Sequence, residues 1–166
     1  MVSEARPGDY YPGNAGRPHP GPSAVTLSRE IRDGIVAHAR REVPNEACGI
    51  VVGDRPAADG GRALRWAPLR NALASPYRYA IDPDDLLRLT IETDDADEVF
   101  WAIVHSHVAS PARPSPTDLS ESHYPDAMYV LVSLDPGESD PSGGPGLRAW
   151  RIADGAVHEV ALRIAD

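Results

Sequence analysis

The sequence predicts an α/β (α+β) fold in which helices flank a central mixed β-sheet, giving a three-layer domain. Three observations lead to this class. The expected segments follow the order helix, strands, helix, strand, helix, strands, which is typical of helices packed against one sheet. Several of the strands are short runs of apolar and β-branched residues, as found in buried strands. The chain has 166 residues, 42% of them hydrophobic, which is enough for one core.

The first 24 residues differ in composition from the rest. They contain five prolines and four glycines with hardly any aliphatic side chains, so they cannot bury enough apolar area to offset the entropy lost on ordering. We therefore predict a disordered tail over residues 1–24 and a single domain over residues 25–166. The pair Tyr10-Tyr11 could dock on a partner or on the domain, and an unstructured tail is the preferred interpretation.

The first half of the domain is predicted to begin with a helix. Ser28 is its candidate N-cap, apolar residues then recur at helical spacing, and the helix ends near Glu42, before Pro44. The sequence beyond this helix predicts three strands, within residues 45–53, 64–69 and 77–81.

The second half begins with a helix that starts at Asp82, has Pro83 in its first turn and ends in the acidic run of residues 92–98. The remaining elements are a strand over residues 99–104, a short helix from 116 to about 123, a strand over 127–134, a loop over 135–146, and strands over 147–152 and 157–164. The Asp154-Gly155 dipeptide between the last two strands is typical of a hairpin turn.

Composition limits the function classes. The net charge is −9, which argues against nucleic acid as a partner, because that affinity rests on clustered positive charge. No segment approaches the roughly 20 apolar residues that span a bilayer, so we expect no membrane association and a cytoplasmic protein. The single Cys48 excludes an internal disulfide framework and a Cys-rich zinc site, and we assign it no role.

The segment from residue 101 to 118 is the strongest candidate for a functional site. His105 and His107 follow an apolar run that predicts a strand, and side chains two apart on a strand point to the same face. Both could therefore reach one metal ion at about 2.0–2.1 Å, while Ser106 points away. Ser115 is a candidate N-cap of the next helix, whose first turn could bring Asp118 back as a third ligand.

Each part of this pattern has a simpler interpretation. His-x-His alone is a weak signal, and Ser115 with Asp118 could be a purely structural capping box. A carboxylate such as Glu46, at the entrance of an apolar strand, is more often a solvated end than a catalytic group. Taken together, however, two histidines and one carboxylate would leave a tetrahedral zinc ion with one open position, which is typical of catalytic and not of structural zinc.

These residues resemble the JAMM motif of the JAB/MPN domain metallopeptidases. The pattern is Glu46 before a Cys-Gly strand, then His105-Ser106-His107, seven residues, Ser115, two residues and Asp118. The resemblance implies a cytidine-deaminase-like three-layer domain and a zinc hydrolase of amide or isopeptide bonds. It also implies that His105, His107 and Asp118 bind Zn²⁺, that Glu46 is the general base, and that Ser115 stabilises the oxyanion.

In size and local sequence the chain is most similar to the Mec-type peptidases of this family. That resemblance implies a small ubiquitin-like sulfur-carrier protein ending in Gly-Gly as partner, from which cysteine is released in cysteine biosynthesis. An isopeptidase for another ubiquitin-like modifier is the alternative enzyme, and a non-catalytic MPN scaffold module is a third possibility. A zinc deaminase is excluded because its Pro-Cys-x-x-Cys element is missing. The sequence does not indicate the oligomeric state.

Overall fold

The computed structural model describes residues 11, 14, 21–140 and 143–166. Its strands are β1 (Ala24–Ser28), β2 (Cys48–Gly53), β3 (Ala63–Leu69), β4 (Val99–His107), β5 (Met128–Ser133), β6 (Gly146–Ala153) and β7 (Ala156–Ala165). Its helices are α1 (Arg29–Glu42), α2 (Pro83–Asp95) and α3 (Pro116–Ser120), with short 3-10 turns at Ala57–Asp59 and Pro136–Glu138.

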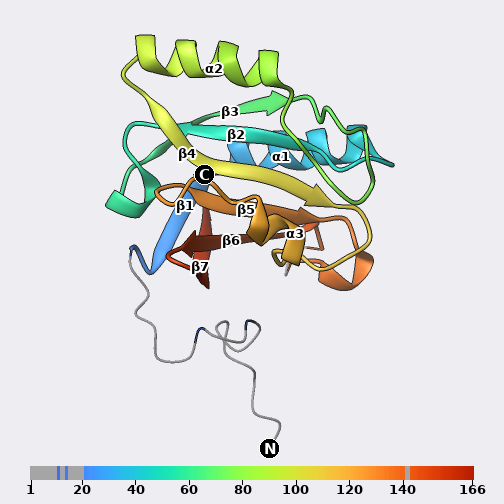
Figure 1. Ribbon diagram of the computed structural model, residues 1–166. Helices are drawn as coiled ribbons and strands as arrows, with labels where there is room; N and C mark the ends of the chain where they lie inside the picture. Colours follow the sequence, from blue (N-terminus) through green and yellow to red (C-terminus); the bar gives the residue numbers. More distant parts are fainter. Residues whose placement is uncertain (1–10, 12–13, 15–20, 141–142) are drawn as a thin grey trace, which may run out of the picture.

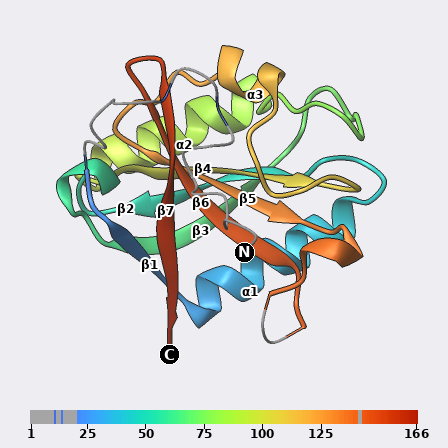
Figure 2. The ribbon, with the colours of Figure 1, turned by 90° about the horizontal axis from the view of Figure 1, so that it is seen from below.

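All seven strands form one mixed sheet, in the order β1-β7-β6-β5-β4-β2-β3 (Figure 1). The pairs β1–β7 and β4–β5 are parallel, and the other four pairs are antiparallel. Helix α1 lies on one face of the sheet, and α2 and α3 lie on the other (Figure 2). The arrangement confirms the predicted three-layer fold with a mixed central sheet.

Each face of the sheet carries its own apolar cluster. Ile31 and Ile35 of α1 pack into one cluster, whereas Leu86 and Leu89 of α2 and Leu119 of α3 pack into the other. The central strands β2 and β5 are buried along their whole length, as expected for strands covered on both faces. The metal-competent end of β4 is therefore held between two paired strands in the middle of the molecule.

Local sequence signals fix the ends of the helices. The Ser28 side chain accepts a hydrogen bond from the Ile31 amide at the start of α1, and the Asp82 side chain accepts from the amides of Asp84 and Asp85 at the start of α2. Both residues satisfy backbone donors that have no partner within the helix. The predicted N-terminal ends of both helices are thus confirmed.

The predicted hairpin between the last two strands is also present. Asp154 and Gly155 have φ angles of 54° and 69°, which is the conformation that a two-residue hairpin turn requires. The turn matches the twist of the two strands that it joins, β6 and β7.

Two predictions of secondary structure were wrong, and one strand was not predicted. Residues 77–81 form no strand, because the side chain of Asn71 binds the backbone of Arg78 and Ala80 and folds this segment into a loop with a single bridge between Asn71 and Ile81. Helix α3 ends at Ser120 instead of near residue 123, where serine hydroxyls bind the carbonyls of the last turn.

The third error is an omission, since strand β1 was not predicted. Val25 and Leu27 are its buried residues, and they alternate with less buried neighbours. Its backbone pairs with β7, which lies more than 130 residues later in the chain, so no local pattern indicated it. Most of the predicted disordered tail, residues 1–24, lies outside the described residues, and that prediction stays open. In the described part of the chain, no helix is long and apolar enough to cross a bilayer.

Candidate metal centre

Three side chains meet at the C-terminal end of β4. The Nε2 atoms of His105 and His107 lie 3.2 Å apart, and each lies 3.2 Å from Oδ2 of Asp118. Ligand atoms on a tetrahedron with bonds of about 2.0–2.1 Å are about 3.3–3.4 Å apart. The triangle therefore has nearly the size that a zinc ion needs. Among the described residues this is the one group of three or more His, Cys, Asp or Glu that could hold a metal ion.

The protonation of His107 suits a metal ligand. Its Nδ1 atom lies 2.7 Å from the carbonyl oxygen of Pro111, so Nδ1 carries the hydrogen and donates it. Nε2, the atom in the triangle, then presents a lone pair. A backbone carbonyl that fixes the tautomer and the ring orientation is the usual support of a metal-binding histidine.

His105 is more deeply buried than His107, and its side chain is 1% exposed. Burial lowers the pKa of His105 and outweighs the favourable charge of Asp118, which keeps the ring neutral. Tyr79 stacks on this ring with centroids 4.4 Å apart and an angle of 22°. Nδ1 of His105 has no hydrogen-bond partner among the described residues.

Asp118 is held by a reciprocal capping box at the start of α3. Its Oδ2 accepts from the Ser115 amide at 2.8 Å, and its own amide donates to the Ser115 hydroxyl oxygen at 3.1 Å. Burial would raise the pKa of Asp118, but the two imidazole rings beside it, His105 and His107, hold this pKa well below its usual range. The same carboxylate, with the Pro111 carbonyl, raises the pKa of His107 despite its burial.

Glu46 faces the two histidines because β2 and β4 are antiparallel. Cys48 pairs with His105 in the sheet, and Ala47 and Ser106 continue the register, since the Ser106 amide donates to the Ala47 carbonyl and the Ser106 hydroxyl accepts from the Ala47 amide. Glu46 is then opposite His107. Residues opposite each other in an antiparallel pair point to the same face, whereas Ser106 points to the other face, as predicted.

The environment of Glu46 favours its neutral form. The residue is 5% exposed, and its Oε2 atom has no hydrogen-bond partner among the described residues. Burial is the main cause that raises its pKa, to about 7; the charge of His107 lowers the pKa and that of Asp118 raises it. A carboxyl group with a pKa near neutrality can both take up and release a proton at the working pH.

The loop that follows β3 holds the backbone of Glu46 from two sides. The Glu46 amide donates to the Ser75 carbonyl at 2.8 Å, and Nδ2 of Asn71 donates to the Glu46 carbonyl at 3.0 Å. Sequence reasoning missed this role of Asn71 and the stacking of Tyr79 on His105. An asparagine before an irregular segment was the available signal, because its side chain can bond to nearby backbone groups.

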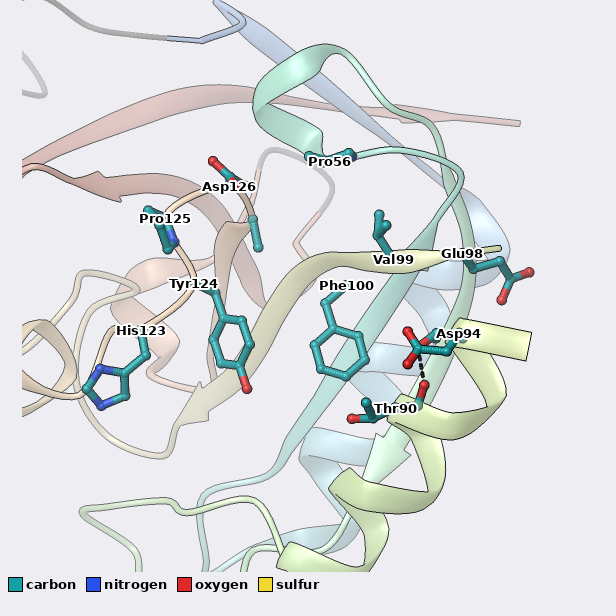
Figure 3. Close-up of a pocket in the computed structure, with 12 residues that line it drawn as sticks. Pro56, Thr90, Asp94, Glu98, Val99, Phe100, His123, Tyr124, Pro125 and Asp126 are labelled. Carbon is teal, nitrogen blue, oxygen red and sulfur yellow. Dashed lines mark hydrogen bonds between the residues drawn. The ribbon is translucent and has the colours of Figure 1, made fainter. Parts of the chain in front are cut away.

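A separate pocket of about 360 Å³ lies at the other end of β4. Figure 3 shows the rings of Phe100 and Tyr124 in this pocket, with the acidic side chains of Asp94 and Glu98 at its edge. None of the three residues of the metal triangle lines it. The pocket is therefore distinct from the candidate metal centre.

The sequence and the fold both match known proteins. Residues 28–153 match the family model Prok-JAB, prokaryotic homologs of the JAB domain. A CysO-cysteine peptidase of Mycobacterium tuberculosis is 40% identical over 143 residues, which cover 86% of this chain and 92% of that protein. A probable TtuB-protein conjugate cleaving protease of Thermus thermophilus is 34% identical over 82% of this chain and 80% of its own length.

Among solved structures, a protein of Desulfitobacterium hafniense superposes with a TM-score of 0.72 and 31% sequence identity, over 86% of this chain and 93% of that one. The family model covers both histidines, the capping box and Glu46. The chain belongs to the Prok-JAB family, the prokaryotic homologs of the JAB domain.

Proposed function

We propose that this protein is a zinc metallopeptidase that hydrolyses the amide bond between the C-terminal glycine of a ubiquitin-like sulfur-carrier protein and cysteine. The observation that carries the proposal is the placement of Glu46 opposite His107, on the same face as a triangle of two imidazole nitrogens and one carboxylate oxygen with 3.2 Å edges. Three protein ligands leave one tetrahedral position open, and this is the arrangement that catalytic zinc uses.

In this proposal His105, His107 and Asp118 hold the zinc ion. Zinc bound there would polarise the scissile carbonyl and activate water as a nucleophile. Glu46 accepts the proton of the attacking water and returns it to the leaving amine, for which a pKa near 7 is suited. The Ser115 hydroxyl oxygen accepts a hydrogen bond from the Asp118 amide. The hydroxyl hydrogen of Ser115 can therefore donate to the developing oxyanion.

Two findings support a carrier protein as the substrate. The relative that is 40% identical is named for the cleavage of CysO-cysteine, and the chain spans 92% of that protein's length. A flexible tail ending in Gly-Gly suits a metal site at the end of a buried strand, because glycine lets the backbone approach the metal closely. We therefore propose a partner that ends in Gly-Gly.

An isopeptidase that removes a ubiquitin-like modifier from other proteins is the second candidate. The relative from Thermus thermophilus, named for the cleavage of protein conjugates, favours it. The two activities differ in the leaving amine, which is free cysteine in one case and a protein side chain in the other. A non-catalytic scaffold module is disfavoured because all three ligand side chains and Glu46 are present.

The proposal is tested by mass-spectrometric time courses on three substrates. These are a sulfur-carrier protein ending in Gly-Gly with cysteine amide-linked to its last glycine, the same adduct with valine as the last carrier residue, and a free peptide of the same tail. We expect rapid release of cysteine from the first substrate and slow cleavage of the other two, because bulk next to the scissile bond blocks the approach to zinc and the carrier fold helps to position the carbonyl.

Equal rates on all three would instead indicate a metallopeptidase of broad specificity. A carrier–lysine isopeptide conjugate is added as a fourth substrate, and its faster cleavage than that of the cysteine adduct would favour the second candidate. Absence of turnover on every substrate by the zinc-loaded protein would contradict both enzymatic proposals.

A further inference from the structure

The loop between β4 and α3 is fixed by side chains that bind its carbonyl groups. Ser133 Oγ of β5 donates to the Ser110 carbonyl at 2.6 Å, and Trp150 Nε1 of β6 donates to the Ala112 carbonyl at 2.9 Å. Together with the hydrogen bond from His107 to the Pro111 carbonyl, these contacts hold a loop that does not pair with any strand. Each donor comes from the sheet that carries the site.

A fourth donor comes from the N-terminal segment. The Tyr11 hydroxyl donates to the carbonyl of Pro114 at 3.0 Å, across 103 residues of sequence. The Tyr11 ring also meets the Trp150 indole edge to face, with centroids 5.7 Å apart and an angle of 83°, a preferred geometry for aromatic pairs. Tyr11 therefore binds the last carbonyl before Ser115.

Asn14 anchors the same segment a second time. Its side-chain amide donates to the Val157 carbonyl, and its Oδ1 accepts from the Val157 amide at 3.2 Å. Asn14 is 8% exposed. This two-way bond to one backbone residue of β7 replaces the partner that a further strand would supply. It holds Asn14 on the domain, and the Asn14 amide in turn donates to the Tyr11 carbonyl at 3.2 Å.

The bond to Pro114 bears directly on the candidate metal centre. The Pro114 carbonyl and the Ser115 amide belong to one peptide group, which is planar and rigid. The oxygen of this group accepts from Tyr11, and its N–H donates to Oδ2 of Asp118 at 2.8 Å. Turning the plane would move both ends, so the Tyr11 hydroxyl and the metal-facing oxygen of Asp118 are linked through one rigid unit.

We infer that Tyr11 is a positioning residue of the active site. Its hydroxyl fixes the plane of the Pro114–Ser115 peptide, and thereby the orientation of the Asp118 carboxylate and the Ser115 hydroxyl. Tyr11 lies outside residues 28–153, the part that matches the family, so this chain supports its site with a segment that the family pattern does not include. The catalytic consequence rests on the proposed function, whereas the structural one does not.

The test is Tyr11→Phe in the full chain, which keeps the ring on Trp150 and removes only the hydroxyl. The matched control is Tyr124→Phe, another half-buried tyrosine, which lies in the pocket at the other end of β4. Three quantities are measured for each variant: hydrogen exchange of the peptide that covers residues 108–120, the dissociation constant for Zn²⁺, and kcat and KM on the carrier–cysteine adduct.

For Tyr11→Phe we expect faster exchange in residues 108–120, zinc binding weakened about 3- to 10-fold, and kcat lowered by a similar factor with little change in KM. These factors lie at or below the lower end of what the loss of a metal-site supporting contact causes. Tyr124→Phe should have the same hydrogen exchange, zinc affinity and kinetic constants as the protein without substitutions. If the unchanged protein turned over no carrier adduct, the proposed function would fail, and exchange and zinc binding would still decide the role of Tyr11.

Two results would overturn the inference. One is a Tyr11→Phe protein with unchanged exchange, zinc affinity and kcat. The other is faster exchange in residues 108–120 with unchanged zinc affinity and kcat, since that pattern indicates a packing contribution only.

Discussion

The burial of the Glu46 carboxylate lowers the free energy of unfolding. A carboxylate that is 5% exposed and has one oxygen without a hydrogen-bond partner among the described residues loses its hydration without full replacement. Such a cost is expected at positions that a protein retains for activity and not for stability. In metal-free protein the cost depends on pH.

We predict that Glu46→Gln stabilises the metal-free protein more at pH 8 than at pH 5. The pKa of Glu46 is raised from 4.5 to about 7 in the folded state. The free energy of unfolding is therefore not reduced by Glu46 ionisation below about pH 4.5, and it falls as the pH rises through about 7, where the buried carboxyl group loses its proton. At pH 8 the ionised, buried form costs roughly 2–4 kcal/mol, and glutamine, which does not ionise, avoids that cost.

Thermal unfolding of both proteins in the presence of a chelator measures this difference. The gain in melting temperature should be several degrees larger at pH 8 than at pH 5. A gain of equal size at the two pH values would show that ionisation of Glu46 does not control it. Metal-free protein is required because a bound dication would itself lower the pKa of this carboxyl group.

At the scale of elements, the loop after β3 is the part that places Glu46. Asn71 makes four hydrogen bonds there: its Nδ2 donates to the carbonyls of Glu46 and Arg78, and its Oδ1 accepts from the amides of Leu73 and Ala80. One side chain thus supplies the interactions that a strand pair would otherwise supply. Loss of this side chain should therefore change the position of Glu46.

We predict that Asn71→Asp lowers the free energy of unfolding by about 1–3 kcal/mol and reduces kcat. The change puts a carboxylate oxygen where an amide now donates to two carbonyls, so two hydrogen bonds become repulsive contacts. Urea unfolding and steady-state kinetics measure the two effects. Ser75→Ala is the control, because it removes one exposed hydrogen bond to Tyr77 and leaves the Ser75 carbonyl bound to the Glu46 amide.

Unchanged kcat in Asn71→Asp, or an equally large loss in Ser75→Ala, would contradict this account of the loop. In the first case Glu46 would be held by the adjoining strand β2 alone, and in the second the loop would act without a special part for Asn71.

At the scale of the whole molecule, the metal triangle links a strand of the sheet to a helix that lies on one face of it. His105 and His107 belong to the central strand β4, whereas Asp118 belongs to α3 on one face. An ion bound by all three should therefore stabilise the folded state as a whole, since the unfolded chain has no such site.

We predict that removal of zinc by a chelator lowers the melting temperature and that added zinc restores it. Zinc at about 100 times its dissociation constant contributes roughly 2.7 kcal/mol, which corresponds to about 5–10 °C for a domain of this size. In Asp118→Asn the amide is a much weaker ligand, so the zinc-dependent shift should be largely lost. Calorimetric scans with and without zinc measure it, and a full shift in Asp118→Asn would remove Asp118 from the ligand set.

The sequence by itself determined the features that depend on neighbours in the chain. The period of two along a strand puts His105 and His107 on one face, and the capping box at Ser115 places Asp118 in the first turn of α3. Both are local geometry, so the spacing of the residues was sufficient to predict them. The helix ends at Ser28 and Asp82 were predictable for the same reason.

Only the tertiary structure decided which distant segments meet at these residues. Glu46 faces His107 because β2 pairs with β4 across about 60 residues, Asn71 folds a segment that was predicted as a strand, and Tyr11 reaches Pro114 from a region predicted to be a tail. Such contacts depend on the register of the sheet and on packing summed over the whole core. A local pattern of residues carries neither quantity, and so the supporting contacts of the site could not be predicted from the sequence.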